Sequence, residues 1–159
     1  MIHADDAQPE PPRPEADLPR LTLHFDGGSR GNPGPGGVGV VIADEADGTV
    51  RHARGFFLGR CTNNQAEYTG LIRGVELAAA LKPQHLDIVS DSELLVKQIK
   101  GVYRCKNEKL KPLFAEANAL LVALPAYTIR HVKRNLNQNA DALANAAMDA
   151  KADLNRDPA

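Results

Sequence analysis

The sequence lacks several features that would place it in a specialised class of proteins. It has no tryptophan, 4% aromatic residues and two cysteines, Cys61 and Cys105, which stand in no Cys-x-x-Cys or Cys/His spacing. A disulfide framework or a structural zinc site therefore has no support. No apolar run approaches the ~18 residues of a membrane span, and the N-terminus shows neither the basic nor the apolar region of a signal peptide. We expect a soluble, cytoplasmic, monomeric protein with no membrane contact.

The chain has no overall excess of positive charge, since its net charge is -1, but the two signs are unevenly distributed. Residues 1–19 carry five acidic side chains against Arg13 alone, or -4, whereas the remaining chain has 18 basic and 15 acidic side chains, or +3. Residues 97–111 hold six cationic side chains and one acid, Glu108. This basic run has two interpretations, a solvated helix face or a surface that binds phosphates.

Composition and periodicity divide the chain into three parts. Residues 1–20 are rich in Pro, Glu, Asp and Ala and can bury almost nothing, which predicts a disordered tail. Residues 21–150 carry the regular patterns of one domain, and residues 151–159 follow the last of these patterns and are expected to fray. The fold and any functional site are therefore expected within residues 21–150.

Alternation of apolar and polar residues predicts three strands at the start of this domain, over residues 21–26, 38–43 and 49–58. The segment between the first two strands is dense in Gly and Pro, which predicts a loop. Because the three strands are joined by short connections, we expect them to pair as an antiparallel meander.

The pattern then becomes helical, with apolar residues three and four positions apart. Thr62 or Asn63 is the expected N-cap of the first helix, and Pro83 closes it. A strand, two helices, a strand and a helix follow over residues 85–91, 92–101, 111–124, 126–132 and 139–150. This order predicts an α/β fold with a five-stranded mixed sheet, in which a helical crossover makes the fourth strand parallel to the first.

Four acidic residues lie at junctions between these elements, namely Asp26, Glu67, Asp91 and Asp141. Asp26 and Asp91 end strands that are expected to be parallel, so they emerge at one sheet edge, where open α/β sheets bind ligands. Each acid also has a structural interpretation. Asp91 suits a turn or a cap, whereas Glu67 and Asp141 suit the positive ends of helix dipoles. Because Glu67 and Asp141 border the apolar faces of their helices, all four acids are expected to point toward that edge.

Four carboxylates at one place repel one another unless a cation compensates their charge. An all-oxygen ligand set without Cys or His suits Mg²⁺, with Mn²⁺ as a substitute. Two such ions about 4 Å apart activate water and stabilise the leaving oxygen in phosphodiester hydrolysis. The four acids therefore predict a metal-dependent nuclease.

The acids are embedded in four strings, FDGGSRGNPGPGG, TNNQAEY, VSDSELLVKQI and NADALANAA, in this order. With these strings the sequence resembles the type 1 ribonuclease H family, over residues 21 to about 150. The resemblance implies a ribonuclease H-like fold and an endonuclease that cuts the RNA strand of RNA/DNA hybrids, leaving 5′-phosphate and 3′-hydroxyl ends. It also implies that Asp26, Glu67, Asp91 and Asp141 are the catalytic residues and bind two metal ions.

The resemblance further implies a surface that binds the hybrid. In the family, the Gly-rich loop and the TNN segment read 2′-hydroxyl groups in the minor groove, and a pocket at a helix N-terminus binds a phosphate of the DNA strand. The corresponding substrate-binding residues here are Ser29, Asn32, Arg60, Thr62, Asn63, Asn64, Lys106, Asn107 and Arg134. Helix capping is the alternative role of Asn63 and Asn64.

The sequence departs from the family at two places. Many bacterial members carry a histidine in the loop before the last helix, but here this loop, KRNLNQNAD, has none. His131 lies earlier, in a predicted strand, whereas Arg134, Asn135 and Asn137 are better placed to meet substrate. The short segment 101–111 indicates the compact form of the family without the basic handle. We expect weak or salt-sensitive hybrid binding as the consequence.

Three other functions are compatible with parts of this pattern: a nuclease for another substrate such as double-stranded RNA, a non-catalytic hybrid-binding module, and a domain of a larger polyprotein. The complete set of four acids argues against the binding module, and the lack of a polymerase segment favours a free-standing enzyme. The Gly-rich loop does not indicate a nucleotide-binding loop, because it lacks Gly-Lys-Ser/Thr and leads into a strand.

Overall fold

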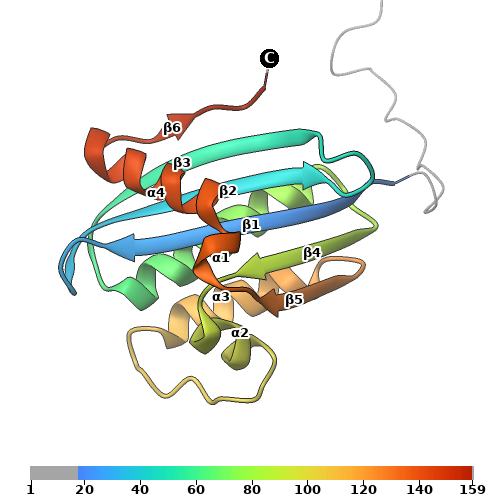
Figure 1. Ribbon diagram of the computed structural model, residues 1–159. Helices are drawn as coiled ribbons and strands as arrows, with labels where there is room; N and C mark the ends of the chain where they lie inside the picture. Colours follow the sequence, from blue (N-terminus) through green and yellow to red (C-terminus); the bar gives the residue numbers. More distant parts are fainter. Residues whose placement is uncertain (1–17, 159) are drawn as a thin grey trace, which may run out of the picture.

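The computed structural model describes residues 18–158 and contains one mixed sheet of six strands in the order β5-β4-β1-β2-β3-β6 (Figure 1). The strands are β1 (Arg20–Ser29), β2 (Gly34–Asp44), β3 (Val50–Cys61), β4 (His85–Ser90), β5 (Tyr127–His131) and β6 (Leu154–Asn155). The helices are α1 (Asn63–Ala80), α2 (Glu93–Ile99), α3 (Lys111–Val122), a short 3-10 helix (Arg134–Leu136) and α4 (Gln138–Ala150). Residues 1–17, which form most of the predicted tail, lie outside the described residues.

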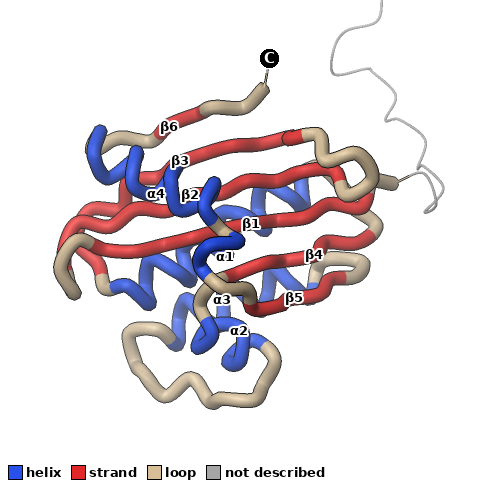
Figure 2. The backbone as a smooth tube through the Cα atoms, viewed as in Figure 1, coloured by secondary structure: helices blue, strands red, loops and turns tan. Residues whose placement is uncertain are grey.

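The sheet combines antiparallel and parallel pairing, as the sequence predicts. β1, β2 and β3 form an antiparallel meander, whereas β4 pairs in parallel with β1 and with β5. α1 makes the crossover between β3 and β4. Figure 2 shows α4 on one face of the sheet and α1 and α3 on the other. Within residues 18–158, none of the helices combines the length and the apolar character needed to cross a bilayer.

The main core lies between the sheet and α1, and the alternation of side chains in β1 explains its position. Leu23 and Phe25 are fully buried and lie against Gly74 and Gly70 of α1, where an added methyl group would be 2.7–2.9 Å from these side chains. Successive side chains of a strand point to opposite faces. Asp26 therefore emerges on the face of the sheet that α4 covers.

The Gly-rich segment, predicted as a loop, is largely part of the sheet, so that prediction is wrong. β1 continues to Ser29 and β2 begins at Gly34, so that only residues 30–33 form the turn. Gly36 illustrates the physical reason, because it lies directly against the sulfur of Cys61 in β3 and leaves no room for a Cβ atom. At Gly36 glycine therefore permits the close approach of neighbouring strands, whereas Gly31, with a φ of 91°, belongs to the turn.

The prediction of five strands is also wrong, because a sixth strand lies in the segment that was expected to fray. We call residues 151–158 the C-terminal strap. Its β6 pairs antiparallel with Arg54 and Gly55 of β3. The Asp157 carboxylate accepts hydrogen bonds from Arg54 Nη2 (2.7 Å) and the Ala53 N–H (2.9 Å), and lies 2.9 Å from His52 Nδ1. The strap is thus held largely by polar contacts, which its mainly polar sequence does not reveal.

We expect Asp157→Asn to lower the free energy of unfolding by about 2 kcal/mol at pH 7, because charge-assisted hydrogen bonds lose their anion. Hydrogen bonding by Arg54 is the main cause that lowers the pKa of Asp157 from 3.8. The contribution is therefore complete above this value and declines as the pH falls below it. Urea titrations between pH 7 and pH 3 measure the difference.

The control is Asp149→Asn, which removes the partner of Arg30 on the surface. This change should alter the stability by less than about 0.5 kcal/mol. Equal stability of the Asp157→Asn variant and the wild type at pH 7 would show that the strap is not anchored by this carboxylate.

Candidate active site

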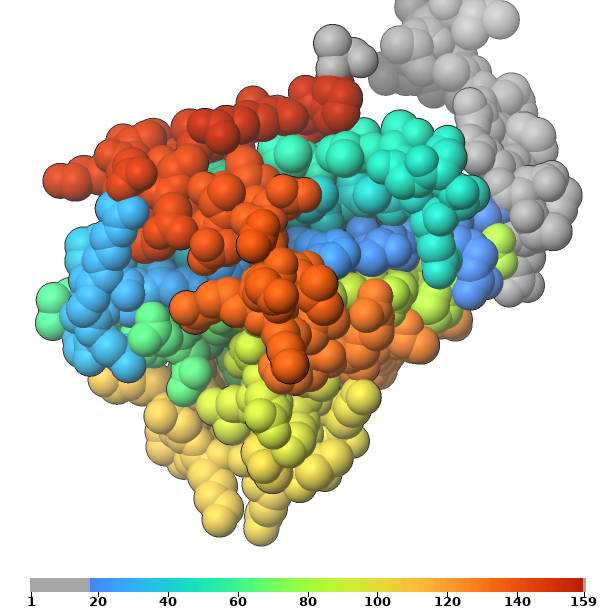
Figure 3. All heavy atoms as spheres, viewed as in Figure 1, coloured from blue at the N-terminus to red at the C-terminus, as the bar shows by residue number. Residues whose placement is uncertain are grey.

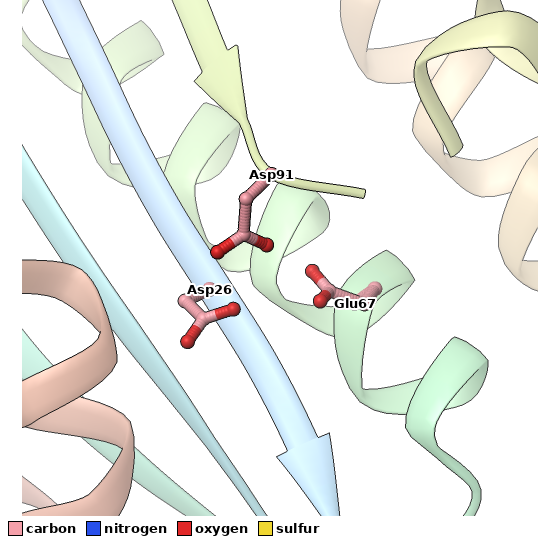
Figure 4. A group of neighbouring side chains, drawn as sticks. All are labelled: Asp26, Glu67 and Asp91. Atoms are coloured by element: carbon pink, nitrogen blue, oxygen red, sulfur yellow. The ribbon is translucent and has the colours of Figure 1, made fainter. Parts of the chain in front are cut away.

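Three carboxylates from three separate elements converge beside β1, at the carboxyl end of β4 (Figure 4). Asp26 lies in β1, Glu67 in α1 and Asp91 directly after β4, and each offers an oxygen within 4.8 Å of the others. The parallel pairing explains the position of the two aspartates. His24 of β1 pairs with Val89 of β4. Asp26 and Asp91 each come two residues after the member of this pair on their own chain segment. The structure thus brings together three of the four predicted acids.

Glu67 reaches this position because α1 packs very closely on β1. α1 begins at Asn63 with Thr62 as N-cap, so Glu67 lies in the second turn and not in the first. This position removes the helix-dipole interpretation of Glu67. Gly27, the residue after Asp26, lies against the backbone of Ala66 and leaves no room for a side chain. The absence of a Cβ at Gly27 therefore allows Glu67 to approach Asp26.

The buried carboxylates are costly to ionise together. Burial, a hydrogen bond with Asp141 and the charge of Asp91 raise the pKa of Asp26 to about 8. Arg134 opposes this increase. Burial is also the main cause that raises the pKa of Glu67 well above its usual value, followed by the charges of the two neighbouring aspartates. A bound cation would remove this penalty.

The residues fit a hard divalent cation. The donors are carboxylate oxygens alone, the type of ligand that Mg²⁺ and Mn²⁺ prefer. Glu67 Oε2 and Asp91 Oδ2 are buried, and neither has a hydrogen-bond partner among residues 18–158. Buried polar atoms are normally paired, so two buried carboxylate oxygens without such partners, in a cluster of acids, fit coordination to a cation. Asp26, Glu67 and Asp91 can therefore hold such a cation.

Asp141 approaches the cluster from α4, which lies on the face of the sheet opposite to α1 (Figure 2). It lies outside the group of three, yet it is close enough to raise the pKa of Asp26 by a hydrogen bond and by its charge. Gly39, which pairs with Asp26 in the sheet, lies directly against the backbone of Ala140. Asp141 also lies in the first turn of α4, so its helix-dipole interpretation still applies. The structure places the fourth acid at the border of the cluster.

Several of the predicted substrate-binding residues connect the Gly-rich segment to the start of α1. Asn63 Oδ1 accepts hydrogen bonds from Ser29 N–H (2.8 Å) and Ser29 Oγ (3.1 Å). The Asn63 N–H donates to Asn32 Oδ1 at 3.1 Å. Thr62 caps the helix by accepting from the Gln65 N–H, so capping is not the role of the Asn63 side chain. These contacts hold the Gly-rich segment on the helix that carries Glu67.

A hollow beside the N-terminus of α1 brings together more of the predicted substrate-binding residues. Its lining consists of Asn32, Thr62, Asn64, Gln65, Asn107, Lys109 and Leu110. Lys109 was missed as a site residue, although it belongs to the basic run, because sequence distance does not show which lysine faces the helix. Arg60 and Lys106 are exposed and do not line the hollow.

The basic run is mostly a loop of turns between α2 and α3, which projects from the body of the molecule (Figure 3, residues 100–110). Its interpretation as one solvated helix face is therefore wrong. Lys97 pairs with Glu93 at 2.6 Å and lies over the ring of Tyr103, and Lys111 pairs with Glu108 at 2.7 Å. The four other cations, Lys100, Arg104, Lys106 and Lys109, are exposed.

The loop before α4 differs from expectation at one residue. Arg134 is close enough to Asp26 to lower its pKa, and Asn135 is exposed. Asn137, which was expected to meet substrate, is 2% exposed and donates from Nδ2 to the Phe25 carbonyl at 2.8 Å. The expectation for Asn137 is wrong, because the residue belongs to the interior.

Comparison with known proteins identifies relatives of this chain. The family model described as "Reverse transcriptase-like" matches residues 24–147. A ribonuclease HI of Halobacterium salinarum is 42% identical over 82% of this chain and 65% of its own length. A ribonuclease H of Sulfurovum sp. is 33% identical over 85% of this chain and 95% of its own. The chain spans 36% of a bifunctional protein of Mycobacterium tuberculosis that is 41% identical to it.

A solved structure adds a similarity in three dimensions. The crystal structure of LC11-RNase H1 in complex with an RNA/DNA hybrid has a TM-score of 0.78 and 38% identity, and the match covers 82% of this chain and 98% of that one. The chain therefore shares both sequence and fold with these proteins over most of its described residues. It spans about two thirds or less of the length of the first curated relatives, at 65% and 36%.

We expect Asp26→Asn to stabilise the metal-free protein at pH 8 by at least ~1 kcal/mol. Because the folded-state pKa is raised, ionisation of Asp26 opposes folding increasingly as the pH rises from 3.8 to about 8. Thermal unfolding with EDTA at pH 4 and pH 8 measures this, and the gain should be smaller at pH 4.

The same two proteins are then compared in excess Mg²⁺, because a ligand that binds the folded state raises Tm. Mg²⁺ should raise the Tm of the wild type more than that of Asp26→Asn. An Asp26→Asn protein that is less stable than the wild type at pH 8 in EDTA would contradict the repulsion inferred at this site.

Proposed function

Because this chain belongs to the ribonuclease H family, we propose that it is a divalent-metal-dependent endonuclease that hydrolyses the RNA strand of RNA/DNA hybrids. One observation carries the proposal: Asp26, Glu67 and Asp91 meet within 4.8 Å, with two buried oxygens that lack partners among the described residues. The hybrid bound to LC11-RNase H1 supports the substrate class, since that protein matches most of this chain.

The reaction is hydrolysis of a phosphodiester. Water attacks the phosphorus, and the bond between phosphorus and the 3′ oxygen breaks, which leaves a 5′-phosphate and a 3′-hydroxyl. Asp26, Glu67 and Asp91 are the residues that would hold Mg²⁺ or Mn²⁺, with Asp141 beside Asp26. When bound, two such ions supply activation of the water and stabilisation of the leaving oxygen. Arg134 is close enough to lower the pKa of Asp26, and its positive charge would favour a substrate phosphate near the metal site.

Recognition of the hybrid depends on the start of α1. A hybrid differs from DNA by the 2′-hydroxyl groups of one strand, and short polar side chains that lie close to glycine backbone can bind these groups. Ser29 and Asn63 provide such side chains and are already bonded to each other. The hollow with Thr62 and Lys109 lies at the N-terminus of an 18-residue helix, a place that favours a phosphate.

We expect the wild type to cleave the RNA of an end-labelled hybrid with Mg²⁺ or Mn²⁺ and to leave duplex DNA of the same sequence intact. Asp91→Asn should reduce the rate roughly a thousandfold, or about 4 kcal/mol, because it replaces one charged ligand of the metal. The assay includes EDTA as the metal-free condition and duplex RNA as a competing substrate.

Asp149→Asn is the matched control, because Asp149 is an exposed acid whose partner is Arg30. This variant should cleave like the wild type. A hybrid that is bound but not cleaved with either metal would replace the proposal with a binding module, and preferential cleavage of duplex RNA would change the substrate class.

Lys109→Gln tests the proposed phosphate contact. The variant should raise KM for the hybrid several-fold with little change in kcat, and the salt dependence of binding should become shallower by about one unit of slope. Lys82→Gln, at the opposite end of α1, is the control and should change neither. Unchanged KM and salt slope in Lys109→Gln would place the bound phosphate elsewhere.

A further inference from the structure

Asn137 is one of few polar side chains that the structure buries almost completely, with 2% of its surface exposed. Its amide Nδ2 donates to the carbonyl oxygen of Phe25 at 2.8 Å, and its Oδ1 lies 3.2 Å from His24 Nδ1. Because Nδ2 is the donor to Phe25, Oδ1 accepts, and the His24 ring donates from Nδ1. Asn137 thus uses both ends of its amide on two consecutive residues of β1.

These contacts join two of the proposed metal-site acids through the backbone. Phe25 is the residue before Asp26, so the hydrogen bond from Asn137 fixes the peptide that leads into Asp26. On the other side, the Asn137 carbonyl accepts the first helical hydrogen bond of α4 from the Asp141 N–H at 3.1 Å. One residue therefore contacts the strand beside Asp26 and the turn that carries Asp141.

The packing of α4 explains why a specific polar contact is needed there. α4 lies on the sheet over glycines, and an added Cβ at Gly37 would be 2.7 Å from the carbonyl oxygen of Ala144. Gly55 has the same relation to Leu143, at 2.8 Å. Contact with these glycines fixes the distance between α4 and the sheet. Because glycine has no side chain, the same contact does little to prevent α4 from sliding along the sheet. The Asn137 amide supplies a directional contact at the end of the helix that carries Asp141.

We propose that Asn137 is a positioning residue that sets Asp141 opposite Asp26 and thereby completes the metal site. The inference rests on the proposed function. Asn137 is not a catalytic residue, because its side chain is buried and committed to Phe25 and His24 and does not meet substrate. It acts through Asp141, and His24 takes a secondary part by orienting the Asn137 amide.

The test compares Asn137→Ala with Leu143→Ala, which removes buried packing from the same helix but leaves the Asn137 contacts in place. Both variants should have a lower Tm than the wild type, so assays are run at a temperature at which circular dichroism shows all proteins to be folded. We expect Asn137→Ala to lower kcat at least about tenfold with KM changed less than about twofold, since small misplacement of a reacting group costs much rate. Leu143→Ala should keep kcat within about threefold.

A second measurement does not depend on activity. Isothermal calorimetry with Mn²⁺ and no substrate should show a weaker affinity for Asn137→Ala than for Leu143→Ala. If the wild type binds Mn²⁺ but does not cleave hybrid, the proposed function fails, and the calorimetry alone still decides the role of Asn137.

His24→Ala covers the case in which Asn137→Ala does not fold. Removal of the weaker contact should lower kcat and Mn²⁺ affinity in the same direction but by a smaller factor. The proposal is overturned if Asn137→Ala keeps both values, if Leu143→Ala loses as much as Asn137→Ala, or if His24→Ala is unchanged when it is the only folded variant.

Discussion

The confinement of like charges at one buried place beside β1 governs the rest of this structure. Asp26 and Glu67 carry raised pKa values because water is excluded from them and other carboxylates are near. Such an arrangement opposes folding, so the surrounding scaffold must be stable enough to impose it. The apolar core under β1, with Leu23 and Phe25 fully buried against α1, supplies that stability directly behind the site.

Recognition and chemistry share one rigid element in this protein. The first residues of α1 cap the helix, hold the Gly-rich segment and line the hollow with Lys109. Glu67 follows one turn later on the same helix. Contacts that order the proposed substrate surface at Ser29 therefore also restrain the helix that carries a proposed metal ligand. Because α1 carries both regions, the helix would hold a substrate bound at its start at a fixed distance from the metal site.

The order of elements and the parallel pairing of β1 with β4 could be predicted, because strand alternation, helical periodicity and a long crossover are all local signals. The same reasoning brought Asp26 and Asp91 together, although Asp26 does not end its strand as predicted, because β1 continues to Ser29. Prediction from local patterns failed for segments and side chains whose position depends on contacts between residues far apart in the sequence. The strap is ordered by Asp157 with Arg54, and Asn137 is buried by its contact with Phe25, more than 100 residues away. No local pattern distinguishes such residues from exposed polar ones, and the strand glycines look like loop glycines until their neighbours are known.

The glycines under α4 lack Cβ atoms, and this lets the helix that carries Asp141 lie close to the sheet. Figure 1 shows α4 by itself on its face of the sheet, so its contacts with the strands dominate its docking. Gly37, Gly39 and Gly55 each meet the helix backbone where a single methyl group would separate the two layers. Separation of those layers would carry Asp141 away from Asp26 while the core on the other face stayed intact.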